Sequence, residues 1–331
     1  MKKKVFVARA AFPQVLERLR KHFEVVTNEE DRIFTADELV ARAAGMQGLF
    51  TTGSERITPA LFAANPQLEA VCNMAVGYNN IDVDAATAAG VMVTNTPDVL
   101  TETTADFAWA LLMAAARRIT ESEHWLRAGK WTKWRYDTLL GADLHGATLG
   151  IIGMGRIGQA VARRSLGFNM RVVYHNRSRL TAEQEQAANA ARWVEKDELL
   201  RTADHVMLVL PYSAATHHTV GAAELALMKP TATLTNVARG GIVDDAALIA
   251  ALRERRIAAA GLDVFENEPA LNPGFLELQN VVLTPHIASA SEPTRLAMAN
   301  LAADNLLAAL SGEVPPNLLN PSVRRKQETR N

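Results

Sequence analysis

Cysteine and excess charge are both scarce in this sequence. Its 331 residues include one cysteine, Cys72, which excludes an internal disulfide framework and suits a reducing compartment. The 35 Lys and Arg residues balance 36 Asp and Glu, giving a net charge of -1. A chain without a basic excess offers no electrostatic footprint for nucleic acid or for an acidic membrane surface.

Long apolar runs are lacking as well. The longest strongly apolar stretch, residues 107–116, is too short to cross a bilayer. The apolar run after Lys2–Lys4 breaks at Arg9, which is too early for a signal peptide. We therefore expect a cytoplasmic protein with no membrane and no nucleic-acid partner. The 48% of hydrophobic residues is enough for a sizeable core and about two domains.

Short apolar stretches alternate with helical patterns along most of the chain. The first hundred residues predict five strands separated by helices, namely 5–8, 23–26, 49–51, 68–72 and 91–94. Residues 103–128 predict one long helix closed by Gly129, and alternation resumes from Ala147 to Thr284. A last helix is expected over residues 292–310. This order is typical of an α/β protein with parallel sheets.

One glycine-rich turn in the second alternating region indicates a ligand. Gly153, Gly155 and Gly158 follow an apolar strand and open a helix that begins near Arg156. Such glycines permit a tight turn, the approach of a pyrophosphate and close packing of helix on strand, while the helix N-terminus attracts the anion. We favour dinucleotide binding. The alternative is a turn that serves the fold alone.

The strand after this turn indicates which nicotinamide cofactor is used. An NAD-binding domain of this kind ends its second strand with an acidic residue that binds the ribose hydroxyls. Here residues 171–174 are followed by His175, Asn176, Arg177, Ser178 and Arg179, with no acid. Two arginines suit a 2′-phosphate, so we predict that NADP(H) is preferred, with NAD(H) as the alternative. The histidines at 205, 217 and 218 are spaced unlike a metal site, and no metal is expected.

Several blocks together carry a family resemblance. In addition to the glycine turn, they are residues 76–82 (VGYNNID), 96–101 (TPDVLT), 236–244 (NVARGGIVD), 263–269 (DVFENEP) and 285–290 (PHIASA). The sequence resembles the D-isomer-specific 2-hydroxyacid dehydrogenases over nearly its whole length, and within them most of all the glyoxylate/hydroxypyruvate and 2-ketogluconate reductases. The resemblance implies a Rossmann cofactor domain, residues 100–287, inserted into a flavodoxin-like substrate domain, residues 1–99 and 288–331. A cleft between the two would hold nicotinamide and substrate.

Three residues suit the reduction of a 2-oxo acid, and the family gives the matching positions the same roles. Arg239 suits the substrate carboxylate, because a guanidinium binds it through two parallel hydrogen bonds. His286 suits the proton donor, and Glu268 would orient it and stabilise its charged form. Glu266 lies close by, but the family pattern places the catalytic glutamate directly before the proline. Taken singly, each residue also fits a structural role.

The remaining site residues come from the same motifs. Backbone N–H groups at Val76 and Gly77 are expected to bind the substrate, with Thr52 and Gly53 lining the pocket beside Arg239 and His286. The full cofactor-binding set is Thr104, Gly153, Gly155, Arg156, Ile157, Gly158, His175, Asn176, Arg177, Ser178, Leu210, Pro211, Thr216, Val237, Ala238, Arg239, Asp263, His286 and Ala288. The family implies a homodimer. Tryptophans at 109, 125, 131 and 134 fit either core packing or a subunit interface formed by the arm Trp125–Leu144.

The leading hypothesis is an NADPH-preferring reductase of glyoxylate, hydroxypyruvate or 2-ketogluconate, producing D-2-hydroxy acids. One alternative is an NAD-dependent dehydrogenase of the same family that acts on other 2-hydroxy acids. Another is a binding protein that senses dinucleotides, since the resemblance extends to corepressors with the same architecture.

Overall fold

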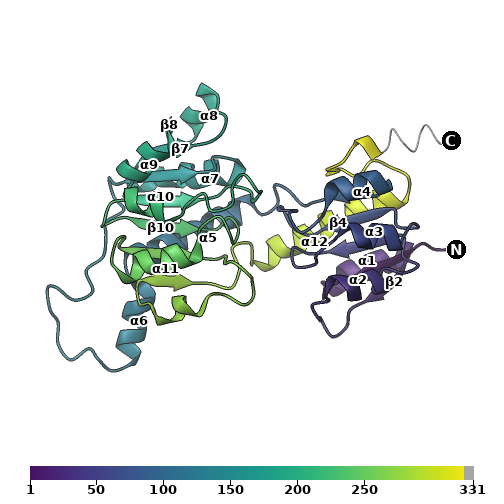
Figure 1. Cartoon of the computed structure of the whole chain (residues 1–331), viewed down its shortest axis with the longest axis horizontal. Helices are drawn as coiled ribbons and strands as arrows, with labels where there is room; N and C mark the ends of the chain where they lie inside the picture. The colour runs from purple at the N-terminus through teal and green to yellow at the C-terminus, as the bar shows by residue number, and fades with distance from the viewer. Residues whose placement is uncertain (324–331) are drawn as a thin grey trace. The chain divides into compact units, whose positions relative to one another are not determined.

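The computed structural model describes residues 1–323, and the chain forms two compact units (Figure 1). Unit 1 comprises Met1–Leu100 together with the chain from Ser291 onward, and unit 2 comprises Thr101–Ala290. Unit 2 is therefore inserted into the sequence of unit 1. The assignment of one unit to substrate and the other to cofactor stays a prediction.

Unit 1 is built on a five-stranded parallel sheet. Its elements are β1 (Lys4–Val7), α1 (Pro13–His22), β2 (Glu24–Thr27), α2 (Ala36–Arg42), β3 (Gly48–Thr51), α3 (Pro59–Ala64), β4 (Ala70–Asn73), α4 (Val83–Ala89), β5 (Met92–Thr94) and α12 (Glu292–Leu310). The strand order β2-β1-β3-β4-β5 is that of flavodoxin-like sheets. The order reverses between β1 and β3, so these two strands flank the switch point of the sheet.

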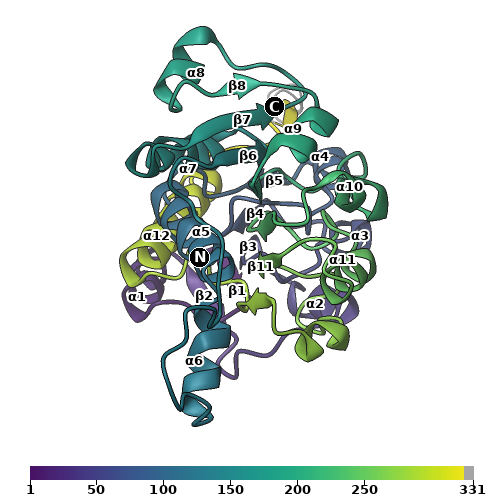
Figure 2. The same cartoon turned by 90° about the vertical axis from the view of Figure 1, so that its left-hand side faces the viewer.

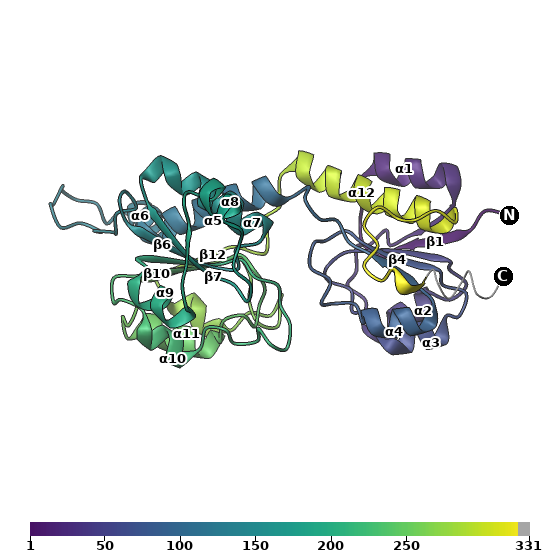
Figure 3. The ribbon, with the colours of Figure 1, turned by 90° about the horizontal axis from the view of Figure 1, so that it is seen from above.

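Helices cover both faces of this sheet (Figure 3). α1 and α12 lie on one face, and α2, α3 and α4 lie on the other. Small and branched side chains of α12, such as Ala302 and Leu306, pack with Val5 and Cys72 of the strands. Beyond α12, the side chain of Asn320 bonds the backbone of β5, so the end of the described chain is fastened to the sheet.

Unit 2 is built on a seven-stranded parallel sheet. Its elements are α5 (Thr101–Ala116), α6 (Ile119–Arg127), β6 (Thr148–Ile152), α7 (Arg156–Arg164), η1 (Ser165–Phe168), β7 (Arg171–His175), α8 (Ala182–Ala187), β8 (Arg192–Trp193), α9 (Lys196–Thr202), β9 (His205–Leu208), α10 (Ala222–Leu227), β10 (Thr233–Asn236), α11 (Asp245–Arg253), β11 (Ala259–Leu262), η2 (Pro273–Glu277) and β12 (Val281–Leu283). The order β12-β11-β10-β9-β6-β7-β8 winds outward in both directions from β6 and β9, as in Rossmann sheets. The predicted fold class, two doubly wound parallel sheets, is confirmed.

The two faces of the unit 2 sheet are covered by different helices (Figures 2 and 3). α5 and α7 pack on one face around a core that includes Trp109 and Tyr174. α9, α10 and α11 pack on the other, around Leu199, Leu248 and Phe275. Both faces of the parallel sheet are thus buried, which explains the apolar sequences of strands such as β6, β11 and β12.

The single long helix predicted over residues 103–128 is wrong, because the chain forms two helices there. α5 ends at Ala116, and the carbonyl of that residue accepts a hydrogen bond from the N–H of Ala142 at 2.9 Å. Arg118 then adopts a left-handed conformation, with φ +52°, before α6 begins. The returning loop therefore uses the carbonyl that a continuing helix needs. α6 and the loop that follows it project from the body of unit 2 (Figures 1 and 3).

The lack of long apolar runs and the single cysteine can both be examined in the structure. Within residues 1–323, no helix is both long and apolar enough to cross a membrane. Cys72 is completely buried in β4, and this burial raises the pKa of its thiol to about 12. The thiol is therefore protonated and shielded from reagents at neutral pH.

Candidate active site

The glycine-rich turn joins the end of β6 to the start of α7. Gly153 has a φ of +101°, and a Cβ there would lie 2.6 Å from the backbone nitrogen of Leu210. A Cβ on Gly158 would lie 2.4 Å from the carbonyl oxygen of Gly153. Real Cβ atoms do not approach backbone this closely, so these two glycines are needed for the turn and for the seat of α7.

The middle glycine leaves space for an anion. A Cβ on Gly155 would meet no atom of the described chain within 4 Å. Gly155 is also the N-cap of α7, where the first N–H groups have no partner within the helix. The side chain of Asn176 accepts a hydrogen bond from the N–H of Met154 at 2.7 Å and so fixes the turn. This arrangement fits the pyrophosphate of a dinucleotide.

The end of β7 carries no carboxylate. Its last residue is His175, followed by Asn176, Arg177 and Ser178. The guanidinium of Arg179 donates to both oxygens of Glu185, at 2.7 and 2.8 Å, and is already committed to that ion pair. This leaves the exposed Arg177 and Ser178 as the side chains at this strand end that suit a 2′-phosphate.

The three predicted catalytic residues follow three neighbouring strands. Arg239 follows β10, Glu268 follows β11 and His286 follows β12, and the carboxyl ends of parallel strands meet at one edge of the sheet. Nδ1 of His286 lies 2.7 Å from Oε2 of Glu268. The backbone N–H of Phe265 donates to the other oxygen, Oε1, at 2.8 Å. The carboxylate is therefore held in place and turned toward the imidazole.

Nearby positive charge keeps the carboxylate of Glu268 ionised. Burial would raise the pKa of Glu268, but the hydrogen bond and charge of His286, the N–H of Phe265 and the charge of Arg239 together hold it below its usual value. Burial lowers the pKa of Arg239, which the charge of Glu268 opposes. A guanidinium remains protonated at any physiological pH despite such a shift. The site thus presents a carboxylate beside two groups that carry or accept positive charge.

Asp263 fixes the loop that carries His286. Its Oδ1 accepts hydrogen bonds from the Thr284 hydroxyl and the N–H of Ile287, at 2.7 and 2.8 Å. Its Oδ2 accepts from the N–H of Ala288 at 2.8 Å. These bonds span the residues on both sides of His286, which itself has a φ of +54°. Contacts of Asp263 and Ala288 with a cofactor stay predictions.

Close packing fastens the loop of Arg239 to the loop of Glu268. A Cβ on Gly240 would lie 1.7 Å from the carbonyl oxygen of Phe265, so no larger residue fits there. Glu266 makes different contacts from Glu268. Its carboxylate lies 2.6 Å from Nε2 of His218, and its N–H donates to Asp245. The contact that distinguishes Glu268 from Glu266 is thus the one with His286.

Most of the other predicted cofactor residues follow strands of the unit 2 sheet or begin α7. Leu210 and Pro211 follow β9, and Thr216 donates its hydroxyl proton to the Pro211 carbonyl at 2.9 Å. Val237 and Ala238 follow β10 and are buried. The remaining members are Thr104 on α5 and Arg156 and Ile157 at the start of α7. Their contacts with a cofactor stay predictions.

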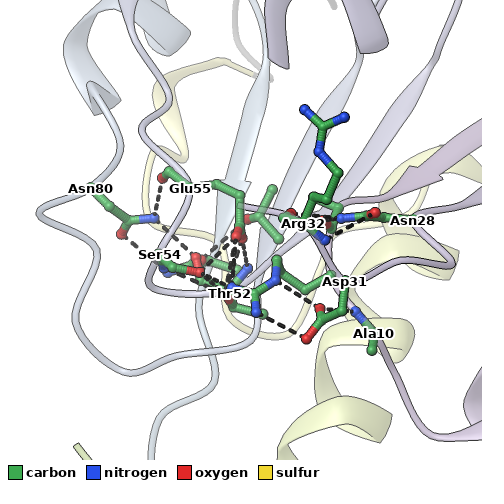
Figure 4. A network of polar contacts seen from close by, with 12 residues as sticks. Ala10, Asn28, Asp31, Arg32, Thr52, Ser54, Glu55 and Asn80 are labelled. Carbon is green, nitrogen blue, oxygen red and sulfur yellow. Dashed lines mark hydrogen bonds and ion pairs between the residues drawn. The ribbon is translucent and has the colours of Figure 1, made fainter. Parts of the chain in front are cut away.

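The predicted substrate residues of unit 1 lie in two loops. Thr52 and Gly53 follow β3, and Val76 and Gly77 follow β4, its neighbour in the sheet. Sequence reasoning missed two residues that organise these loops, Glu55 and Asn80 (Figure 4). For Glu55 the sequence did hold a signal, because Thr52 and Glu55 have the T-x-x-E spacing of a capping box.

No metal site accompanies these residues. Within residues 1–323, the His, Cys, Asp and Glu side chains form no group of three or more that could hold a metal ion. His205 instead bonds Thr233 and the Asp143 carbonyl, and His217 bonds Tyr212.

Comparison with known proteins places the chain in a family. The model for the D-isomer specific 2-hydroxyacid dehydrogenase, NAD binding domain, matches residues 109–288. The chain is 49% identical over 327 residues to the glyoxylate reductase of Thermococcus gammatolerans, covering 98% of this chain and 97% of that protein. It is 48% identical over 326 residues to the glyoxylate reductase of Aeropyrum pernix, covering 97% and 96%.

Solved structures agree in fold over nearly the whole chain. An NADPH-dependent glyoxylate/hydroxypyruvate reductase of Sinorhizobium meliloti, in complex with NADP and malonate, matches with a TM-score of 0.87 and 37% identity, covering 98% of both chains. A putative D-isomer specific 2-hydroxyacid dehydrogenase of a Polaromonas species matches with a TM-score of 0.88 and 38% identity, covering 96% of this chain and 100% of that one.

The two parallel α/β units and the glycine-rich turn define a nicotinamide-dinucleotide-dependent oxidoreductase. The chain belongs to the D-isomer specific 2-hydroxyacid dehydrogenase family and is an NAD(P)-dependent enzyme.

Proposed function

We propose that the protein reduces small 2-oxo acids, with glyoxylate and hydroxypyruvate first among them and 2-ketogluconate as a larger member, to D-2-hydroxy acids. NADPH is the preferred cofactor. The observation that carries the proposal is the 2.7 Å contact between His286 and Glu268 at the strand ends beside Arg239. The names of the relatives, glyoxylate reductase and NADPH-dependent glyoxylate/hydroxypyruvate reductase, support it.

His286 is the proton donor in this proposal. Its Nδ1 is engaged by the Glu268 carboxylate, so Nε2 is the nitrogen that delivers a proton to the substrate ketone oxygen. The ionised Glu268 fixes the ring orientation and stabilises the imidazolium, which is the form required for reduction. A bound nicotinamide supplies the hydride.

Arg239 holds the substrate. Its guanidinium presents donors that match the two oxygens of a carboxylate, and its Nη1 is steadied by donating to the Ala238 carbonyl at 2.7 Å. The loops at Thr52–Gly53 and Val76–Gly77 complete substrate binding in this proposal, so unit 1 is the substrate domain and unit 2 the cofactor domain.

The cofactor preference follows from β7. A strand end without a carboxylate lacks the usual partner of the NAD ribose hydroxyls, and the exposed Arg177 and Ser178 offer a cation and a hydroxyl to a 2′-phosphate. Because Arg179 is paired with Glu185, we assign the phosphate contact to Arg177. The bound NADP in the Sinorhizobium meliloti relative supports this preference.

We also propose that the protein is a homodimer. α6 and the loop after it expose a group of large apolar side chains, namely Ile119, Leu126, Trp131, Trp134, Tyr136 and Leu140. Side chains of this type gathered on one projecting segment are typical of a protein interface. Trp109, in contrast, is buried and stacks on Phe168, so the four tryptophans divide between the core and the arm.

Steady-state kinetics at 340 nm test the proposal. Glyoxylate, hydroxypyruvate and 2-ketogluconate are each supplied with NADPH and with NADH, and kcat/KM is compared. We expect turnover with NADPH favoured, and a His286→Ala variant whose kcat falls by about 10²–10⁴-fold while NADPH still binds. Turnover that survives His286→Ala removes the assigned acid, and a clear preference for NADH removes the cofactor assignment. NADPH binding without turnover of any 2-oxo acid identifies a dinucleotide-sensing protein instead.

A further inference from the structure

The switch point of the unit 1 sheet holds a group of polar side chains (Figure 4). Arg9 follows β1, and Thr52, Ser54 and Glu55 follow β3, the two strands between which the strand order reverses. In open α/β sheets, ligands bind outside the carboxyl ends of strands at such a point. The group therefore lies where this unit is best placed to bind a small molecule.

Glu55 is a carboxylate buried within the first predicted substrate loop. Its residue is only 2% exposed, and every contact of its carboxylate described by the structure lies at this switch point. Oε2 accepts hydrogen bonds from the N–H and, at 3.0 Å, the hydroxyl of Thr52, and Oε1 accepts from the Ser54 hydroxyl at 2.7 Å. A carboxylate is buried only when its lone pairs are satisfied. Here they are satisfied by the loop itself, so the carboxylate sets the loop conformation.

Arg9 balances the charge of this loop. Its Nη1 donates to the Ser54 hydroxyl at 2.9 Å and lies 3.9 Å from Oε1 of Glu55. Its Nε donates to Asp31 at 2.8 Å, and this hydrogen bond helps to lower the pKa of Asp31. The guanidinium thus connects the ends of β1 and β3 and offsets the negative charge buried beside the loop.

Asn80 joins this loop to the second one. Its side-chain amide nitrogen donates to the carbonyls of Thr52 and Glu55, at 3.1 and 2.9 Å. The adjoining Asn73, wholly buried in β4, donates to the Gly77 carbonyl at 3.1 Å. The N–H of Ile57 also donates to the Asn80 carbonyl at 2.8 Å. Loop 52–55 and loop 76–80 are therefore held together, and the amide of Asn80 supplies the side-chain hydrogen bonds that join them.

We propose that Glu55 and Asn80 are positioning residues for substrate: they hold Thr52–Gly53 and Val76–Gly77 in the relative placement that binds the carboxylate of the 2-oxo acid. This inference rests on the proposed function, which assigns substrate binding to those loops. Neither side chain touches substrate in this scheme. The N–H groups of Val76 and Gly77 do, and small displacements of positioned groups are costly for binding and catalysis.

The test replaces Asn80 and uses Asn28 as a matched control. Asn28 is another asparagine of unit 1, more buried than the half-buried Asn80, and its amide nitrogen likewise donates to two carbonyls, those of Ala8 and Arg32. Its side-chain hydrogen bonds reach neither loop. We expect Asn80→Ala to raise KM for glyoxylate about tenfold or more, with KM for NADPH and kcat changed less than about threefold. Asn28→Ala is expected to lower Tm by about as much as Asn80→Ala does, and to leave KM for glyoxylate unchanged.

A second variant and a binding measurement complete the test. Glu55→Gln keeps the size of the side chain, but its amide nitrogen cannot accept the Thr52 N–H, so KM for glyoxylate is expected to rise again. Calorimetric titration of the NADPH-loaded protein with malonate follows carboxylate binding without turnover. Weaker malonate binding by Asn80→Ala and Glu55→Gln, with a wild-type protein that reduces no 2-oxo acid, sinks the proposed function and retains the positioning role. Equal effects of Asn80→Ala and Asn28→Ala, or no effect of Asn80→Ala and Glu55→Gln, overturn the positioning role itself.

Discussion

Single residues at the strand ends of unit 2 differ chiefly in what they contact. Glu266 and Glu268 are two positions apart, yet one contacts His218 and the other His286. The sequence offered the proline after Glu268 as the distinguishing signal, through a family pattern. The geometry adds a physical reason, because the Phe265 N–H turns the Glu268 carboxylate toward the imidazole.

Glu268→Gln is expected to move the pH profile of reduction. The pKa of Glu268 is held below its usual value, so the carboxylate is charged throughout the neutral range and favours the protonated imidazole. A Gln side chain carries no such charge, so the alkaline limb of kcat/KM for reduction is expected to move to lower pH. The measurement is kcat/KM for glyoxylate between about pH 5 and about pH 9, in the range where the protein remains folded.

Glu266→Gln is the matched control for this change. It removes a carboxylate two residues away that does not contact His286, so the alkaline limb is expected to stay in place. Parallel displacement by both variants would show that general charge, rather than the His286 contact, sets the profile.

At the scale of elements, the strands and helices that carry the site were predicted well from sequence. Apolar runs locate β6 and β7, and the glycine spacing locates α7, because buried parallel strands and tight turns limit the residues allowed. β8 has two residues and no apolar run, so periodicity had nothing to detect there. The break between α5 and α6 depends on Ala142, more than twenty residues away, which a local pattern does not contain.

The close packing of α7 on the glycine-rich turn predicts the effect of adding one methyl group at Gly158. Gly158→Ala places a Cβ at 2.4 Å from the Gly153 carbonyl oxygen, so α7 must move away from the turn that is proposed to bind the pyrophosphate. We expect the Kd for NADPH to rise about tenfold or more, since such a shift removes aligned N–H donors. Titration of NADPH fluorescence measures it.

Gly167→Ala provides the comparison, because a Cβ at Gly167 meets no atom of the described chain within 4 Å and φ is not in the left-handed region there. Its Kd for NADPH should equal that of the wild type. If Gly158→Ala also binds NADPH normally, the turn does not hold the cofactor through α7.

At the scale of the whole molecule, the arm formed by α6 and the loop after it is the segment proposed to form the homodimer interface. Trp134 is 78% exposed and Tyr136 is 82% exposed, and exposed aromatic side chains of this size are uncommon unless a partner covers them. Replacing both with serine is expected to convert the proposed homodimer to a monomer, because Trp and Tyr are prominent among the residues that dominate the binding energy of an interface. Light scattering coupled to gel filtration gives the mass of each species.

Leu166→Ser serves as the control for the arm variant, since Leu166 is an exposed apolar residue of η1 outside the arm. It should leave the mass unchanged. A wild-type protein that is monomeric at micromolar concentration, or an arm variant that remains dimeric, contradicts the assignment of the arm to the interface.

The course of the chain through unit 1 affects the order in which the protein folds during synthesis. All five strands of unit 1 leave the ribosome before unit 2, but α12, which covers one face of their sheet, is made after it. Until α12 is made, that face is covered only in part, by α1, and its core is incomplete, whereas unit 2 has all its elements in one continuous segment. Domains fold as units once their sequence is available. The half of the enzyme that is synthesised first is therefore the half that finishes folding last.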